Sequence, residues 1–233
     1  MLTKRALFII LLLIGFIINS TGQEKYLTES STHIFWQPER QLTKSDFQGN
    51  GTDNPKCLKY CENHDLCTSA FVGLFAVLDI PKKKGKRGKL IEKAYFAPAF
   101  EKHTSYILNN DTAGIKKQEV VFDIYELSAR FARKQLNHFQ DSIPGYGITT
   151  IMFKTVQSRA NEMQTSLIDN YSQDLYINKR KGAYKEWREK INELLYDSRE
   201  FATTPEDCYR FIINEPIESD YVKAKKIVGN LDE

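Results

Sequence analysis

The sequence predicts an α+β fold in which a small antiparallel sheet from the N-terminal half packs against three main helices from the C-terminal half. Two apolar, strand-like runs, residues 69–80 and 90–96, are separated by a basic turn that contains two glycines. Three segments with apolar residues at three- and four-residue steps follow them, which is typical of amphipathic helices. Strands followed by helices predict an α+β domain.

The N-terminus has the pattern of a signal peptide. Residues 1–5 are basic, residues 6–18 are almost wholly apolar, and Ser20-Thr21-Gly22 supplies small residues at a cleavage point. The apolar run is shorter than the roughly 20 residues that cross a bilayer. We therefore expect cleavage after Gly22 and a secreted or periplasmic product, residues 23–233, that forms one domain and does not span the membrane.

The charge balance excludes one class of partner. The formal net charge of the whole chain is +3, and it falls to +1 when Lys4 and Arg5 leave with the signal peptide. Nucleic-acid-binding domains carry a strong basic excess. We therefore expect no nucleic-acid partner.

The N-terminal half supplies the predicted sheet. Residues 33–36 form a short apolar entry, and Thr43 or Ser45 is placed to cap a turn. Residues 50–56 are polar, contain Gly51 and Pro55, and are expected to form a loop. The run SAFVGLFAVLDI, residues 69–80, is apolar on both alternating faces, which predicts a strand buried on both sides.

Pro81 ends this strand, and the basic turn Lys82-Lys83-Lys84-Gly85-Lys86-Arg87-Gly88-Lys89 leads to the second strand of a hairpin. Two interpretations of the basic turn stay open. It is a solvated loop tip, or it contacts an anionic surface such as envelope polymers or lipid headgroups.

The C-terminal half supplies the three helices, predicted over residues 114–138, 155–176 and 183–198. Their apolar stripes are typical of a core and require no cofactor. The string CYRFII, residues 208–213, is rich in aromatic and β-branched residues and predicts a last strand that returns to the N-terminal half.

The four cysteines, Cys57, Cys61, Cys67 and Cys208, predict two disulfides in an exported chain, and three pairings can be drawn. Three of them are clustered, so we expect a bridge from this cluster to Cys208. Closing a loop of about 140 residues is worth on the order of 5 kcal/mol in the chain-entropy model. The spacings do not match the paired cysteines of structural zinc sites.

A series of short strings runs along most of the mature chain. They are Trp36 with Leu42-Thr43, Asp46-Phe47 and Gly49; Ser69, Phe71 and Gly73-Leu74; Ala99-Phe100 with Ser105-Tyr106; Phe122-Asp123-Ile124-Tyr125-Glu126-Leu127 with Ala129-Arg130; and Tyr171 and Trp187. In this order they resemble a family of secreted bacterial proteins regarded as HExxH zinc-dependent proteases, whose physiological role is unknown. The resemblance implies a zincin-like fold.

The resemblance also implies that the zinc site has been lost. The helical string FDI-x-EL-x-AR looks like the continuation of HExxH, which places the two ligand positions at Lys117 and Val121 and the base position at Gln118. A further ligand position falls near Tyr176. A protonated lysine and a valine offer zinc no donor, and glutamine cannot take a proton from water. We therefore expect no metal and no cofactor.

Three further polar residues of this helix, Asp123, Glu126 and Arg130, can be interpreted either as part of a binding cleft or as structural contacts. Asp123, Glu126 and Arg130 are candidates for the cleft of such a protein. Glu126 and Arg130 are also spaced for an i,i+4 pair, and Asp123 for a buried hydrogen-bond network. Glu119 is a poor substitute for the lost base, because one residue along a helix turns a side chain by about 100°. An ordinary amphipathic helix with no catalytic ancestry remains the competing interpretation.

A second candidate site is the string Cys61-Glu62-Asn63-His64-Asp65-Leu66-Cys67, which is similar to the active-site helix of secreted phospholipases A2. That similarity implies His64 as a base and Asp65 as a calcium ligand. A strand-like run follows it at once, however, and the calcium loop is incomplete. The competing interpretation is a disulfide-braced loop with His64 and Asp65 in solvent.

These observations favour a non-catalytic pseudo-peptidase that binds an unknown envelope protein or peptide. One alternative is an active secreted hydrolase, either a peptidase with unrecognised residues or a calcium-dependent lipase at His64 and Asp65. The other is a structural protein of the bacterial envelope.

Overall fold

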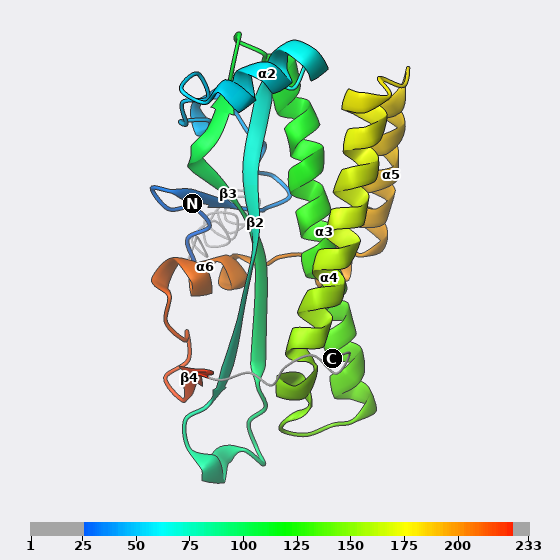
Figure 1. The fold of residues 1–233 in the computed structure, drawn as a ribbon. Coiled ribbons are helices and arrows are strands. Elements are labelled where there is room, and N and C mark those ends of the chain that lie inside the picture. Colours follow the sequence, from blue (N-terminus) through cyan, green and yellow to red (C-terminus); the bar gives the residue numbers. More distant parts are fainter. Residues whose placement is uncertain (1–25, 226–233) are drawn as a thin grey trace, which may run out of the picture.

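The computed structural model describes residues 26–225, so the predicted signal peptide, residues 1–22, lies outside the described part. In that part, the fold is α+β, with a four-stranded antiparallel sheet and five α-helices (Figure 1). The strands pair in the order β1-β3-β2-β4. The elements are β1 (His33–Phe35), α2 (Pro55–His64), β2 (Thr68–Pro81), β3 (Lys93–Ile107), α3 (Thr112–Ser142), α4 (Ile148–Ser172), α5 (Ala183–Asp197), α6 (Pro205–Ile213) and β4 (Tyr221–Lys223).

The predicted hairpin is confirmed and is longer than expected. β2 and β3 pair antiparallel from Thr68↔Ile107 to Asp79↔Lys93, with a register shift between Ser69 and Phe71. β1 and β4 are short strands on the outer edges of this hairpin. Thr43 precedes a 3₁₀ turn, Lys44–Asp46, and its backbone N–H donates to the Asp46 carboxylate at 2.6 Å.

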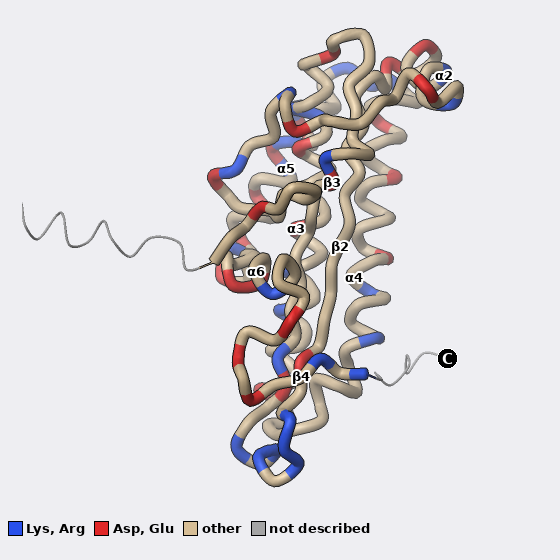
Figure 2. Tube along the Cα trace, turned by 90° about the vertical axis from the view of Figure 1, so that its left-hand side faces the viewer, with Lys and Arg blue, Asp and Glu red and all other residues tan. Residues whose placement is uncertain are grey.

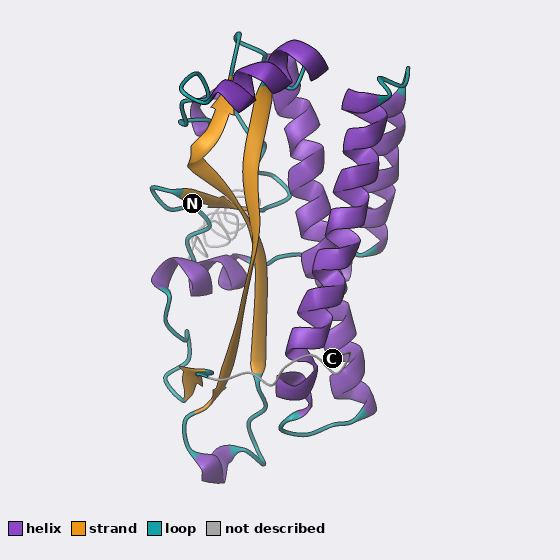
Figure 3. Ribbon diagram, viewed as in Figure 1, coloured by secondary structure: helices purple, strands orange, loops and turns teal. Residues whose placement is uncertain are grey.

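Side-chain alternation gives the sheet two covered faces. On one face, Leu78 and Phe96 pack against Ala129 of α3 and Phe153 of α4. On the other face, Ala97 and Ala99 pack against Cys208 of α6. Figure 3 shows α3, α4 and α5 together on one side of the sheet and α6 on the other.

The prediction that the first strand is buried on both sides is wrong for its first half. Val77 and Leu78 are buried, but Phe71 is 50% exposed and Phe75 is 38% exposed. The reason is that α6 is short: it meets β2 from Phe75, whose ring lies at the edge of this contact, 5.7 Å from the Phe211 ring, to Asp79, which pairs with Arg210. Phe71 lies before this stretch. An apolar sequence therefore overestimates the burial of the uncovered half.

The three predicted main helices are confirmed as α3, α4 and α5. α3 begins after Asp111, whose carboxylate accepts the Gly114 N–H at 3.0 Å and so caps the first turn. The predicted end of the second helix, near residue 176, is a π-helical turn, Gln173–Ile177, that continues α4. This turn places Tyr176 beside the N-terminal part of α3.

Two segments differ from their predicted structure because helix-start signals outweigh composition. Residues 50–56 were expected to form a loop, but Asn54 caps α2 and Pro55 occupies its first position. Residues 208–213 were expected to form a strand, but Thr204 and Asp207 form a capping box that begins α6. In that helix Cys208, Phe211 and Ile212 form one stripe against the sheet.

The prediction of two disulfides, one of them to Cys208, is also wrong. Cys61 and Cys67 form a bridge, and Cys57 and Cys208 are free thiols. Cys208 lies on α6 and packs against the sheet, far in the fold from the cysteines at α2. A bridge over 6 residues is worth about 2 kcal/mol in the chain-entropy model, less than half the stabilisation expected from the long loop.

The two free thiols are expected to differ sharply in reactivity. Cys208 is fully buried, and burial raises the pKa of its thiol, whereas Cys57 is half-buried on α2. Treatment of the folded protein with iodoacetamide should label Cys57 first and Cys208 only after unfolding, as read by peptide mass spectrometry. A Cys57–Cys208 linked peptide in the untreated protein would contradict this arrangement.

Candidate functional site

The positions implied by the family resemblance meet at one end of α3. Gln118, Val121 and Tyr176 line a pocket of about 360 Å³ between α2, α3 and the end of α4, and His64 lines it as well. Lys117 lies just outside this pocket, with its ammonium 5.5 Å from the centre of the Tyr176 ring. The structure therefore brings these four residues and His64 to one place.

The side chains at the zinc positions implied by the resemblance make ordinary packing and hydrogen-bond contacts. The Gln118 side chain is buried, its Oε1 accepts the Ala70 N–H at 3.1 Å, and its Nε2 lies 3.5 Å from the Tyr176 hydroxyl. Burial raises the pKa of Tyr176 to about 12. Val121 packs beside the cluster that contains Tyr171 and Trp187. Within residues 26–225, no group of three or more His, Cys, Asp and Glu side chains is placed to hold a metal ion.

The phospholipase-like string has a different arrangement from a catalytic helix. His64 is the last residue of α2, and Asp65 follows it as a left-handed C-cap with φ of 55°. The Asp65 carboxylate is exposed and pairs with Lys179 at 2.9 Å, and this hydrogen bond lowers its pKa. A carboxylate paired with an ammonium is a poor calcium ligand, because the cation competes for its oxygens.

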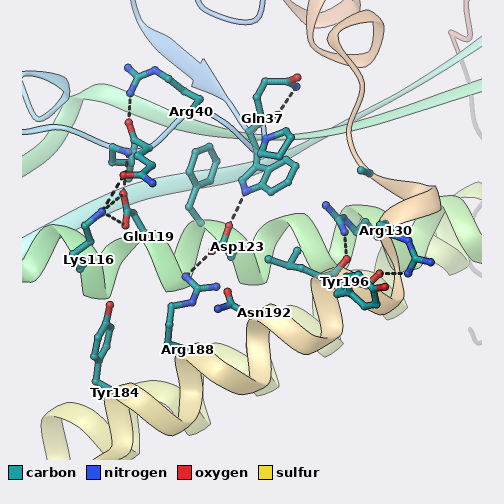
Figure 4. Close-up of a pocket in the computed structure, with 18 residues that line it drawn as sticks. Gln37, Arg40, Lys116, Glu119, Asp123, Arg130, Tyr184, Arg188, Asn192 and Tyr196 are labelled. Carbon is teal, nitrogen blue, oxygen red and sulfur yellow. Dashed lines mark hydrogen bonds and ion pairs between the residues drawn. The ribbon is translucent and has the colours of Figure 1, made fainter.

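A larger cleft, of about 680 Å³, lies on the other side of α3. α3 forms its floor, α5 one wall, and residues 36–42, which follow β1, the other wall. Residues 199–202 close one end. Figure 4 shows side chains from these elements pointing into the space between them.

Asp123 joins the two walls of this cleft. Its Oδ1 accepts the indole N–H of Trp36 at 2.7 Å, and its Oδ2 pairs with Nη1 of Arg188 at 2.7 Å (Figure 4). Trp36 comes from the segment after β1 and Arg188 from α5, so one carboxylate on α3 fixes both. Asp123 therefore takes part in a hydrogen-bond network, which is one of the two interpretations that the sequence allowed for it.

Arg188 has unused hydrogen-bonding capacity. Its Nε and Nη2 atoms are buried and find no acceptor among residues 26–225. These two nitrogens form one edge of the guanidinium, and that edge binds a carboxylate or phosphate with two parallel hydrogen bonds. Buried donors of this kind nearly always have a partner. The cleft lining therefore contains two buried donors that no acceptor among residues 26–225 satisfies.

Cations outnumber carboxylates in the cleft lining. Five cationic residues line it, Arg40, Lys116, Arg130, Arg188 and Arg199, against two carboxylates, Glu119 and Asp123. Arg40 is held by Glu29 at 2.5 Å and Asp46 at 2.8 Å, and neither of these acids lines the cleft. Arg199 stacks on the exposed Tyr196 ring, 4.4 Å from its centre. Arg40, Lys116, Arg130 and Arg188 each pair with a carboxylate. The groups that the cleft offers an anion are therefore the unpaired edge of Arg188 and the guanidinium of Arg199.

Arg130 lines the cleft, but Glu126 does not. The pair between Arg130 Nε and Glu126 Oε1 measures 2.7 Å, with Glu126 fully buried and Arg130 almost so. The Arg130 guanidinium also lies 5.0 Å from the centre of the Trp36 ring. The Glu126 carboxylate instead faces the interior and accepts the Thr203 N–H at 2.8 Å.

The Arg40–Asp46 pair should make the cleft wall sensitive to acid. Burial favours the neutral form of Asp46, but hydrogen bonds from Arg40 and Thr43 outweigh it and lower the pKa below the ordinary 3.8. Its stabilisation is therefore complete above that value and is lost as pH falls below it. Asp46→Asn should lower the unfolding free energy by about 1–2 kcal/mol at pH 7. In urea titrations at several pH values, this difference should shrink below about pH 4; a constant difference down to pH 2 would contradict the assignment.

Sequence reasoning missed the cleft residues that matter most. Arg40, Arg188 and Arg199 stand in polar stretches, where an arginine is normally a solvated charge. The one available signal was the neighbourhood of Arg188, which follows the core residue Trp187 on a helix with a clear apolar stripe. That signal places Arg188 at the border of the buried face without identifying a cleft.

Comparisons with known proteins found no matching family model, no matching curated protein and no matching solved structure. Separately, none of the helices within residues 26–225 has the length and apolar character needed to cross a bilayer.

Proposed function

We propose that this chain is an exported, non-catalytic binding protein that holds an anionic peptide segment in the cleft between α3 and α5. The observation that carries the proposal is the Arg188 edge, whose Nε and Nη2 donors lie buried in the cleft lining without an acceptor in the described chain. Cleft size supports it, since about 680 Å³ lies within the range of roughly 300–1,000 Å³ for ligand sites.

The lining favours a peptide over a small inorganic anion. Trp36, Tyr184 and Tyr196 give the cleft aromatic surface, and Gln37 and Asn192 give it neutral hydrogen-bonding groups (Figure 4). Rigid aromatic and arginine side chains are the groups that dominate protein recognition surfaces. A segment with one or two carboxylates would match both the rings and the guanidinium groups.

A lost peptidase site is part of this proposal. The support for it is that Lys117, Gln118 and Val121 have ordinary packing and hydrogen-bond contacts in place of metal donors. The Cys61–Cys67 disulfide supports export, because such bridges persist in oxidising compartments. The zincin-like ancestry rests on the resemblance of the sequence strings.

The proposal is tested with fluorescein-labelled pentapeptides of glutamate, lysine and serine, measured by anisotropy with the mature protein. The glutamate peptide should bind most tightly. Arg188→Gln should weaken it about 10- to 100-fold, because a charge-assisted bidentate contact is worth roughly 1.5–3 kcal/mol. The matched control is Lys185→Gln, which removes a positive charge from an exposed position of the same helix outside this cleft and should leave binding unchanged.

Three results would overturn the proposal. Equal binding of the serine peptide would show that charge is not recognised, and equal affinity of the Arg188→Gln variant would remove the cleft from the interaction. Cleavage of a peptide during the assay, read by mass spectrometry, would establish the active hydrolase instead.

A further inference from the structure

A second surface, far from the cleft, combines positive charge with exposed aliphatic side chains. It lies at the turn of the β2–β3 hairpin and comprises Lys82, Lys83, Lys84, Lys86, Arg87 and Lys89 with Ile91, Ile143 and Ile151. We call it the basic end. Figure 2 shows its lysines and arginine gathered at the tip of the hairpin, beyond the rest of the fold.

Two residues, Arg87 and Glu92, hold the hairpin turn against residues 146–150. The Arg87 guanidinium lies 4.9 Å from the centre of the Tyr146 ring. The buried Glu92 carboxylate accepts the Gly147 N–H at 2.6 Å and the Thr150 hydroxyl at 2.8 Å. The basic turn therefore lies against the segment that carries Ile143, the C-cap of α3, and Ile151, on the first turn of α4.

Most of the positive charge at this end is available to a partner. Lys86 pairs with Asp220 at 2.8 Å, while Lys82, Lys83, Lys84 and Lys89 are exposed and have no ion pair among the described residues. Three carboxylates near this end are already engaged: Asp220 by Lys86, Glu218 by Lys93, and the buried Glu92 by Gly147 and Thr150. Asp141, on the last turn of α3, has no ion pair among the described residues. Four free lysines against one free carboxylate leave a clear excess of positive charge.

The aliphatic residues identify the kind of anionic partner. Ile143 is 60% exposed, and Ile91 and Ile151 are each 43% exposed. A soluble polyanion gains nothing from such groups, whereas a bilayer surface accepts lysines at its headgroups and aliphatic side chains at the acyl boundary. Nucleic acid is a poor match as well, since the one aromatic ring of this loop pair, Tyr146, is covered by Arg87.

We infer that the basic end docks the folded protein on the surface of an anionic phospholipid bilayer. The four free lysines contact the headgroups, and the isoleucines enter the boundary between headgroups and acyl chains. This contact is separate from the cleft, and a protein held in this way presents the α3–α5 cleft away from the bilayer plane.

Co-flotation of the mature protein with vesicles tests the inference, using equal parts of phosphatidylglycerol and phosphatidylcholine, or phosphatidylcholine alone. We expect binding to the anionic vesicles only. Replacing Lys82, Lys83, Lys84 and Lys89 by glutamine should lower the partition coefficient at least about 100-fold. The matched control replaces Lys56, Lys59, Lys181 and Lys185, four exposed lysines at the opposite end, and should bind as the parent does.

The isoleucines separate a bilayer from a soluble polyanion. The double variant Ile143→Ser, Ile151→Ser should lose roughly tenfold in vesicle binding and should keep its affinity for polyphosphate. Unchanged vesicle binding of this variant, or equal losses in the two lysine variants, would overturn the inference. The glutamate-peptide assay on the same variants should be unaffected, so that a failure here is distinguishable from a failure of the cleft proposal.

Discussion

Replacing Asp79 by alanine is expected to destabilise the protein by about 3–5 kcal/mol, because it leaves the Arg210 guanidinium buried without a counter-charge. Each of the two side chains is 1% exposed. Arg210 Nε donates to Asp79 Oδ2 at 2.6 Å, and Nη2 donates to Oδ1 at 2.8 Å, which is a bidentate pair. Because Asp79 lies on β2 and Arg210 on α6, the pair fixes α6 on the sheet.

Urea unfolding followed by circular dichroism measures this loss, and a double variant shows its cause. Asp79→Leu with Arg210→Met replaces both charges by apolar groups and should recover most of the stability lost in Asp79→Ala. Asp220→Ala, which breaks the exposed pair with Lys86, is the control and should change stability by less than about 1 kcal/mol. If Asp79→Ala behaved like that control, the buried pair would not be what holds α6.

The wrong prediction for α6 shows which parts of the fold can be predicted from the sequence pattern. The long elements were predictable because their pattern repeats: α3, α4 and α5 each carry an apolar stripe, and the hairpin strands flank a turn with two glycines. In short elements the hydrophobic pattern covers too few residues to distinguish the helical period of 3.6 from the strand period of 2. The capping box of Thr204 and Asp207 and the Asn54-Pro55 start then decide the structure, and composition alone gave the wrong result.

The candidate site was harder to predict, because it depends on contacts between distant segments. Asp123 meets Trp36, which is 87 residues away, and it also pairs with Arg188 of α5. No local pattern encodes such a meeting. The α3 positions Gln118 and Val121, taken from the resemblance, line one pocket with Tyr176. Helical periodicity determines which side chains of α3 share a face, so this grouping is easier to predict. The predicted disulfide to Cys208 was wrong because the clustering of the other three cysteines in the sequence does not show which element Cys208 packs against.

Glu126→Ala is expected to destabilise the protein by about 3–5 kcal/mol. The substitution removes no side chain that lines the cleft. Glu126 is fully buried and serves as the common acceptor for Arg130 Nε at 2.7 Å, the Thr203 N–H at 2.8 Å and the Thr203 hydroxyl. Arg133 Nη2 lies 3.9 Å from the same carboxylate. Its loss therefore leaves Arg130 Nε and the two Thr203 donors without their acceptor, and removes the carboxylate closest to the Arg133 guanidinium.

Glutamine separates the hydrogen bonds from the charge. Burial raises the pKa of Glu126 even though Arg133 and Arg130 oppose this, so a neutral side chain of the same shape is tolerated better than a truncated one. Glu126→Gln should lose roughly 1–3 kcal/mol, less than Glu126→Ala. A double-mutant cycle of Glu126→Ala with Arg130→Met, measured by urea unfolding, should give a coupling of about 1–3 kcal/mol.

The same variants decide between a structural and a functional Glu126. If it is structural, Glu126→Gln should bind the glutamate peptide like the parent protein under conditions where both are folded, since its carboxylate faces Thr203 and not the cleft. If Glu126 belongs to the binding surface, peptide affinity should change by about tenfold or more without a matching loss of stability. Arg188→Gln should show the reverse of the structural result, a large loss of affinity with a smaller loss of stability than Glu126→Ala, because the Arg188 side chain is partly exposed in the cleft lining whereas Glu126 is fully buried.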